Sequence, residues 1–251
     1  MTKPVITLKD ATVTVGNQTE ILKQLNLEIY PGDFITVLGT NGAGKSTLFN
    51  AISGDLALSS GAVYHQGKDI TSLPAVKRTA FLARVFQDPK MGTAPRMTVA
   101  ENLLLAEKRG SRRTLRNRHL TSQKLDFYHE ITEKMGNNLE DRLQTAAGSL
   151  SGGQRQALSF LMAIQAKPEL LLLDEHTAAL DPKTSAQLMD ATNHQVVNNH
   201  LTALMITHNL ADALTYGNRL IVLNAGKIVL DVKDQEKKDL SEEDLLEYFV
   251  H

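Results

Sequence analysis

The segment Gly39-Thr40-Asn41-Gly42-Ala43-Gly44-Lys45-Ser46-Thr47 fits the pattern Gly-x-x-x-x-Gly-Lys-Ser at every defined position. It follows the apolar run 34–38 and precedes a helical pattern that begins at Leu48. The glycines let consecutive backbone N–H groups turn toward phosphate oxygens, and the start of the helix adds a positive dipole. Lys45 would neutralise the β- and γ-phosphates, and the Ser46 hydroxyl would ligate Mg²⁺. The segment therefore predicts a nucleotide-binding loop between a buried strand and a helix.

A second buried strand is predicted at residues 170–175, where four leucines are followed by Asp174 and Glu175. Parallel α/β sheets place their ligands at the carboxyl ends of the strands. Asp174 would hold Mg²⁺, through water, and Glu175 would orient and deprotonate the attacking water. The alternative, a solvated acidic pair at a strand end, is the weaker interpretation behind a phosphate-binding loop.

A second phosphate-binding pattern lies at Leu150-Ser151-Gly152-Gly153-Gln154, where a serine and two glycines open a predicted helix. The chain thus carries two candidate phosphate-binding segments but only one of them contains a lysine, and only one acidic pair is present to complete a site. A head-to-tail dimer, in which each Ser-Gly-Gly completes the other subunit's site, explains this most simply. The alternative is an ordinary serine helix cap.

Composition excludes several functional classes. The 251 residues contain no cysteine, which excludes disulfides, thiol chemistry and cysteine-ligated metals. Lys+Arg total 27 against Asp+Glu 28, so a nucleic-acid partner is not expected. Polar residues interrupt the N-terminus before any signal-peptide pattern develops, and the aliphatic run 170–173 is far too short to cross a bilayer. We expect a cytosolic chain.

In the order of the chain, these motifs resemble those of the ATP-binding cassette (ABC) ATPases. Residues 39–47 match the Walker A loop, and residues 170–175 match Walker B with the catalytic glutamate. Residues 150–154 look like the family signature. Gln87 matches the Q-loop glutamine, residues 178–181 resemble the D-loop, and His208 matches the switch histidine.

The resemblance implies an α/β fold. It consists of a P-loop NTPase (RecA-like) core with an N-terminal antiparallel β-subdomain and an inserted α-helical subdomain. On this basis residues 1–87 and 151–231 form the core with the β-subdomain. Residues 88–150 form the helical insertion and residues 232–251 a C-terminal helical tail.

The resemblance also assigns roles. Glu175, His208 and Lys45 would be catalytic, and Ser46, Gln87 and Asp174 would hold Mg²⁺. ATP would be bound by Gly39, Thr40, Asn41, Gly42, Ala43, Gly44, Lys45, Ser46, Thr47, Gln87, Ser151, Gly152, Gly153 and Gln154, the last four from the other subunit. Asp181 would form part of the dimer seam.

The implied system is a transporter whose cassettes pair as a homodimer and drive separate integral membrane permease subunits. A detached cassette favours import, with a substrate-binding protein in the same system and a position on the inner face of the cell membrane. The segments around 87–95 and 174–184 look like a bacterial importer subgroup linked to aromatic amino acids such as tryptophan. A detached exporter cassette and a non-transport protein, such as an Fe–S assembly ATPase, remain alternatives.

Three features fall outside this pattern. Family members usually place an aromatic residue near the end of the first strand to stack on adenine, whereas this chain has Val15. A basic run, Lys108 to Arg118, could bind lipid headgroups or nucleic acid, but no aromatic residues interleave with it, which favours a solvated face. His176 follows the acidic pair without a ligand set around it and is interpreted as a loop residue.

Overall fold

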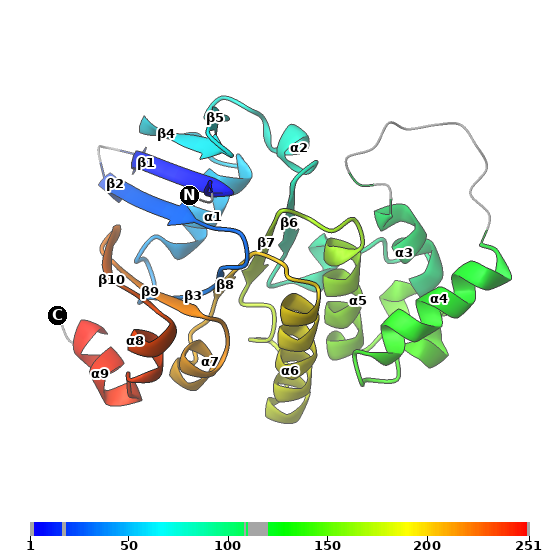
Figure 1. Ribbon diagram of the computed structural model, residues 1–251. Helices are drawn as coiled ribbons and strands as arrows, with labels where there is room; N and C mark the ends of the chain where they lie inside the picture. The colour runs from blue at the N-terminus through cyan, green and yellow to red at the C-terminus, as the bar shows by residue number, and fades with distance from the viewer. Residues whose placement is uncertain (1–2, 17–18, 108, 110–119, 250–251) are drawn as a thin grey trace.

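The computed structural model describes residues 3–16, 19–107, 109 and 120–249. Its strands form two sheets, of four strands in the order β2-β1-β4-β5 and of six in the order β10-β9-β3-β8-β7-β6 (Figure 1). The strands are β1 (Ile6–Val15), β2 (Thr19–Ile29), β3 (Phe34–Leu38), β4 (Ser60–His65), β5 (Lys68–Asp69), β6 (Leu82–Val85), β7 (Leu170–Asp174), β8 (Ala203–Ile206), β9 (Arg219–Asn224) and β10 (Lys227–Lys233).

The α-helices are α1 (Lys45–Ser53), α2 (Ala75–Arg78), α3 (Val99–Ala106), α4 (Ser122–Glu133), α5 (Gly152–Ile164), α6 (Pro182–Asn198), α7 (Leu210–Thr215), α8 (Asp234–Lys238) and α9 (Glu242–Leu246). Short 3₁₀ turns are η1 (Pro89–Met91), η2 (Glu140–Arg142), η3 (Ala147–Ser149) and η4 (Glu247–Phe249). None of the helices within the described ranges is long and apolar enough to span a membrane.

The six-stranded sheet positions the site. Strands β9, β3, β8, β7 and β6 run parallel, and β10 pairs antiparallel with β9 at the edge. Every residue of β3 and β8 is buried, as is typical of parallel strands that are covered on both faces. Because β3, β7, β8 and β6 end at the same edge, the segments that follow them converge there.

The apolar residues divide the core in two. Leu48, Phe49 and Ile52 of α1 belong to a cluster that includes residues of both sheets, so the first helix joins the sheets. A second cluster contains residues of α3, α4, α5 and the face of the large sheet formed by Leu171 and Leu173. Figure 1 shows α3, α4 and α5 gathered to one side of the sheets.

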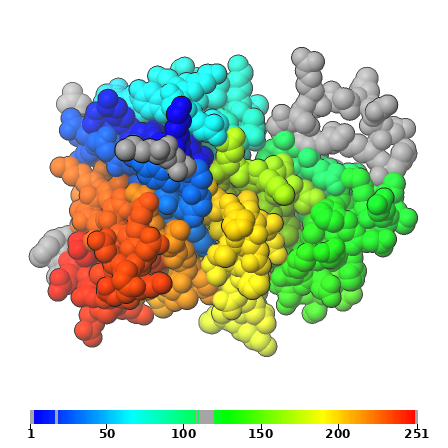
Figure 2. Space-filling view, viewed as in Figure 1, coloured from blue at the N-terminus to red at the C-terminus, as the bar shows by residue number. Residues whose placement is uncertain are grey.

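The C-terminal elements cover the β9 and β10 end of the large sheet, as the red segment in Figure 2 shows. Ser241 caps α9 with its side chain, and Leu245 is fully buried. The predicted terminal helix is therefore present. Helix α8 lies within the segment 232–251 that was predicted as a helical tail, although its sequence, Asp-Gln-Glu-Lys-Lys, has no apolar spacing.

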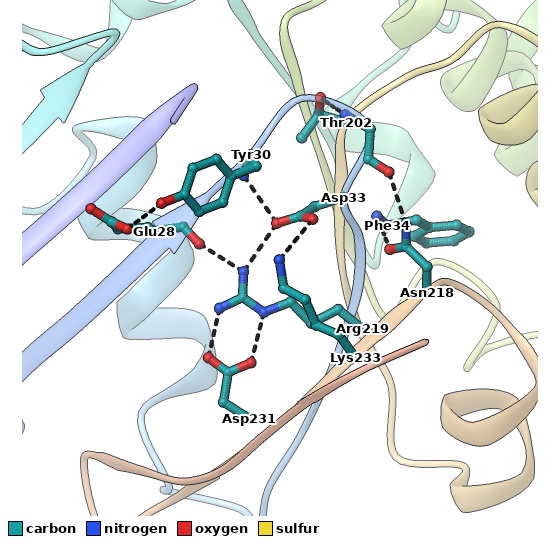
Figure 3. Close-up of polar contacts among 10 residues, drawn as sticks. Glu28, Tyr30, Asp33, Phe34, Thr202, Asn218, Arg219, Asp231 and Lys233 are labelled. Carbon is teal, nitrogen blue, oxygen red and sulfur yellow. Dashed lines mark hydrogen bonds and ion pairs between the residues drawn. The ribbon is translucent and has the colours of Figure 1, made fainter. Parts of the chain in front are cut away.

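A charged cluster fixes the start of β3 against β9 and β10 (Figure 3). Arg219 donates to Asp33 at 3.0 Å and to both carboxylate oxygens of Asp231 at 2.7 and 2.6 Å. Lys233 adds a contact to Asp33 at 3.2 Å, and the Tyr30 amide donates to the same carboxylate. The cluster lies at the opposite end of β3 from the glycine-rich loop.

The fold class predicted from the sequence is confirmed. The boundaries proposed at 87/88, 150/151 and 231/232 remain predictions. The basic run cannot be compared, because Lys108, Arg112, Arg113, Arg116 and Arg118 lie outside the described residues.

Candidate functional site

The glycine-rich loop joins β3 to α1, as predicted, and its glycines are required by local geometry. Gly44 adopts φ 104° at the start of α1, in the left-handed region that favours glycine. A Cβ on Gly39 would lie 2.4 Å from the carbonyl oxygen of Leu223. The loop thus passes too close to β9 for a side chain at its first position.

Lys45 is buried in the loop and held by it. Its Nζ donates to the carbonyl oxygens of Gly39 at 2.7 Å and Thr40 at 3.1 Å. Burial lowers the pKa of Lys45, and the nearby carboxylates of Glu175 and Asp174 oppose that shift. The lysine of the loop and the acidic pair at the end of β7 therefore share one electrostatic environment. Phosphate oxygens would offer Nζ stronger, charge-assisted bonds than the carbonyls do.

Four residues of the loop are exposed, so a ligand can reach them. Thr40, Asn41, Gly42 and Ser46 are exposed, whereas Gly39, Ala43 and Gly44 are buried and Thr47 is half-buried. An added Cβ at Gly42 would meet nothing within 4 Å, so there is free space at the crest of the loop.

Three predicted site residues meet at Glu175. His208 Nε2 lies 2.6 Å from Glu175 Oε1, and Gln87 Nε2 donates to Glu175 Oε2 at 3.4 Å. Glu175 itself has φ 44°, which is strained for a residue with a side chain. Its amide donates to the carbonyl of Ile206 in β8, which anchors the strained residue. The ends of β6, β7 and β8 thus bring together an amide, a carboxylate and an imidazole.

Asp174, the last residue of β7, has a partner that was not predicted. Arg84 Nη2 lies 2.5 Å from Asp174 Oδ2, and both side chains are nearly buried. The signal was available: Arg84 is the one charged residue in the otherwise apolar segment 81–86. Its partner could not be identified, because the sequence does not reveal that β6 pairs with β7.

The donor set suits Mg²⁺. The Ser46 hydroxyl, the Asp174 carboxylate and the Gln87 amide oxygen are hard oxygen donors. Within the described part of the chain, no group of three His, Cys, Asp or Glu residues could hold a metal ion by itself. A cation here would therefore depend on nucleotide phosphates for part of its coordination, which is typical of Mg²⁺.

The Ser-Gly-Gly segment opens α5. Ser151 caps the helix and forms a reciprocal capping box with Gln154, so the ordinary serine cap is present, and Ser151 and Gly152 are exposed at the helix N-terminus. Gly153 is buried, and a Cβ on it would lie 2.4 Å from Thr184 Cγ2. Among the described residues, no hydrogen bond or ion pair links the segment 151–154 to the loop 39–47.

Asp181 and His176 lie in the connection from β7 to α6. Asp181 caps α6 by accepting from the amide of Thr184, and this bonding lowers its pKa. His176 is buried, with Nε2 3.2 Å from Thr192 Oγ1. Burial lowers the pKa of His176 to about 4, so the ring is neutral at physiological pH. His176 is a packed loop residue.

A profile of the ABC transporter family matches residues 22–178. This chain belongs to the ABC transporter family. It is 47% identical over 238 residues to a tyrosine transport ATP-binding protein of Clostridioides difficile (strain R20291), covering 94% of this chain and 93% of the relative. It is 33% identical over 234 residues to the spermidine/putrescine import ATP-binding protein PotA of Haemophilus ducreyi, covering 93% of this chain but 59% of PotA.

Solved structures agree. The ATP-binding cassette MJ1267 of an ABC transporter superposes with a TM-score of 0.80 at 26% identity, covering all of both chains. The cassette MJ0796, a dimer in a post-hydrolysis state bound to ADP and Pi, superposes with a TM-score of 0.75 at 26% identity. The match covers 91% of this chain and 98% of MJ0796. This chain is an ATP-binding, ATP-hydrolysing ABC cassette, as the sequence predicted.

Proposed function

We propose that this cassette powers import of an aromatic amino acid through separate membrane subunits. The observation that carries the proposal is the 47% identity, over 94% of the chain, to a cassette named for tyrosine transport. The PotA relatives are also named for import. The importer-like segments around 87–95 and 174–184 support the same direction of transport.

Glu175 is the proposed general base. It would orient the attacking water and accept its proton, while His208, 2.6 Å away, holds the carboxylate in place. Lys45 would stabilise the charge that develops on the γ-phosphate. Mg²⁺, when bound, would neutralise phosphate charge, and Ser46, Asp174 and Gln87 are the residues proposed to hold it. The Gln87 contact to Glu175 would make the base sensitive to the position of the Q-loop.

The cassette is proposed to act as a head-to-tail homodimer. The exposed N-terminus of α5, with Ser151 and Gly152 at the surface, is free to face a second subunit's γ-phosphate. Among the described residues of one chain, no hydrogen bond or ion pair links this segment to the Walker A loop, and in the proposed dimer the second subunit supplies that contact. The similar cassette MJ0796 is dimeric in its post-hydrolysis state with ADP and Pi bound, which supports pairing of cassettes. Asp181, at the start of α6, would lie at the seam.

The proposed contact for the permease subunit is the turn after Gln87. Met91 of η1 is 69% exposed and lies four residues after Gln87, so its apolar side chain is accessible to a partner beside the Q-loop. The next residue, Gly92, packs against Ser159 of α5, and Gln156 of α5 donates to the carbonyl of Phe86. Pressure on Met91 would therefore be transmitted to both Gln87 and α5. In this proposal the cassette would lie at the inner face of the cell membrane, and a substrate-binding protein would complete the system.

The first test is an affinity pull-down of the tagged full chain from detergent-solubilised membranes of its source cell, followed by mass spectrometry. We expect a stoichiometric multi-span membrane protein. The Met91→Glu variant should lose it, whereas Val76→Glu should keep it, because Val76 is 82% exposed on α2 and away from the Q-loop. Recovery of soluble proteins alone would overturn the transport function.

The second test addresses the substrate. A strain that lacks the gene should lose uptake of labelled tyrosine, tryptophan or phenylalanine, and the wild-type chain should restore it. Complementation with Glu175→Gln is the matched control, because this variant keeps the fold and the partner surface but lacks the base. Normal uptake of all three amino acids in the deletion strain would exclude the aromatic substrate.

A further inference from the structure

Arg84 lies at a nearly buried position, where a charged side chain is energetically unfavourable. It lies in β6 between Ala83 and Val85, both buried, and its own side chain is 12% exposed. Burying a guanidinium costs free energy unless its donors are paired. An apolar residue would serve the packing of this strand better.

The contacts of Arg84 join the end of β7 to helix α1 and the residues that follow it. Nη2 binds Asp174 Oδ2 at 2.5 Å, and Nη1 donates to Asn50 Oδ1 of α1 at 2.7 Å. A weaker contact reaches Asp55 at 3.5 Å. The side chain therefore ties the last residue of Walker B to the helix that follows Walker A.

Aromatic rings fix the plane of the guanidinium. Arg84 Cζ lies 5.0 Å from the ring centroid of Phe86 and 5.9 Å from that of Phe49. Phe86 directly precedes Gln87, and Phe49 lies on α1. Arginine suits this setting because its planar group can stack and donate in two directions at once, which lysine cannot do.

Stability alone does not account for this arginine. Its Nε is buried without a hydrogen-bond partner, a defect that folded proteins rarely tolerate. Buried ion pairs also contribute little to stability compared with apolar packing. An expensive group that is retained beside a proposed metal ligand suggests a role in the chemistry.

We propose that Arg84 is a positioning residue for the carboxylate that holds Mg²⁺. It fixes Oδ2 of Asp174, and no hydrogen bond from a described residue reaches Oδ1, which is left for the metal or its water. Groups that orient a metal ligand in this way typically contribute 10- to 100-fold to metal affinity or activity. The inference rests on the proposed role of Asp174.

A second effect opposes the first. A guanidinium near Mg²⁺ repels it, so removal of Arg84 could also strengthen metal binding. Here the charge is delocalised over the planar guanidinium group, and Asp174 and, more distantly, Asp55 already compensate it. Orientation is therefore expected to dominate. The Arg84→Lys variant separates the two effects, because it keeps the charge but loses the fork.

The test uses the full chain and a fluorescent, non-hydrolysable ATP analogue. Its dissociation constant is measured in EDTA and in Mg²⁺. The ratio of the EDTA value to the Mg²⁺ value reports how much the metal strengthens nucleotide binding. We expect Arg84→Gln and Arg84→Lys both to lower this ratio toward one. The kcat for MgATP should fall about tenfold in both variants, with a smaller change in KM.

Controls identify which idea fails. Asp55→Asn removes the distant partner of Arg84 and should leave the ratio and kcat unchanged. Asp174→Asn should lower both; if it lowers neither, the proposed metal site itself is wrong. If Asp174→Asn lowers them but neither Arg84 variant does, only the positioning role is overturned. A merely structural arginine would lower the thermal unfolding midpoint of both variants and leave the ratio unchanged.

Discussion

The imidazole Nε2 of His208 lies 2.6 Å from Oε1 of Glu175, which joins the residues that follow β8 and β7 in the parallel sheet. His208 is 44% exposed in its side chain and Glu175 only 15%. The carboxylate of Glu175 is therefore nearly buried, whereas its partner His208 remains accessible to solvent and to a ligand. Glu175 also has a strained φ of 44°, and the hydrogen bond from its amide to the carbonyl of Ile206 in β8 anchors it.

Glu175→Gln should abolish most ATP turnover while ATP binding remains. The amide keeps the shape of the side chain and can still contact His208, but it cannot accept a proton from water. General-base catalysis contributes about 100- to 10,000-fold, so the ATPase rate should fall by at least about 100-fold. With ATP, the variant should accumulate as a dimer in size-exclusion chromatography. Glu169→Gln, at the opposite end of β7, is the control; undiminished turnover in Glu175→Gln would remove Glu175 as the base.

Lys45→Ala should weaken nucleotide binding. Charge-assisted bonds of this kind contribute about 1.5–3 kcal/mol, which corresponds to a loss of affinity of about tenfold or more. A titration with fluorescent ATP measures it. Lys134→Ala is the control, because Lys134 is exposed and pairs with Glu130 on α4. Equal affinity in wild type and Lys45→Ala would contradict the phosphate contact.

The strand–loop–helix unit at residues 34–53 could be predicted because its signals are local. Apolar residues, glycines, a lysine and a serine follow one another without interruption, and each constrains its neighbours. The meeting of Gln87, Glu175 and His208 could be expected only through the family resemblance. Its physical reason is that parallel strands end at one edge, which sequence alone does not place in order.

Contacts that depend on strand order could not be predicted. Arg84 contacts Asp174 because β6 lies beside β7 with Arg84 opposite Leu172, a register that no local pattern encodes. Likewise Asp33, which directly precedes β3, contacts Arg219 of β9, because β3 and β9 become neighbours only in the folded sheet. Each of these contacts joins side chains that lie far apart in the sequence.

Arg219→Met should destabilise the cassette. The substitution leaves Asp33, whose side chain is 10% exposed, without its closest cation, and frees Asp231 as well. Loss of one partner from a buried ion pair costs about 3–5 kcal/mol, because the remaining charge stays desolvated. Urea unfolding measures this difference. Arg96→Met, at an exposed position, should change stability by less than about 0.5 kcal/mol; a similar small effect at Arg219 would contradict the argument.

Stability should rise with pH above about 8 because of Lys237. Its buried Nζ donates to the carbonyls of Tyr216 and Gly217, and burial lowers its pKa to about 8. Between this value and about 10.4, where an unfolded lysine titrates, the unfolded chain binds more protons than the folded one. The free energy of unfolding should therefore increase by up to about 1.4 kcal/mol per pH unit in that window. Lys237→Met should lack this increment, and identical pH profiles in both proteins would disprove it.

Base selectivity should be modest because Val15 takes the place of an adenine-stacking aromatic residue. Val15 is the last residue of β1 and is 44% exposed, so its side chain offers a small apolar surface and no π-face. GTP should therefore be hydrolysed at a rate comparable to that of ATP. Stacking of a base on an aromatic side chain contributes about 1–3 kcal/mol, so Val15→Tyr should tighten ATP binding by about fivefold or more, and Val15→Leu should not. A GTPase rate far below the ATPase rate would show that this cassette recognises adenine through other residues.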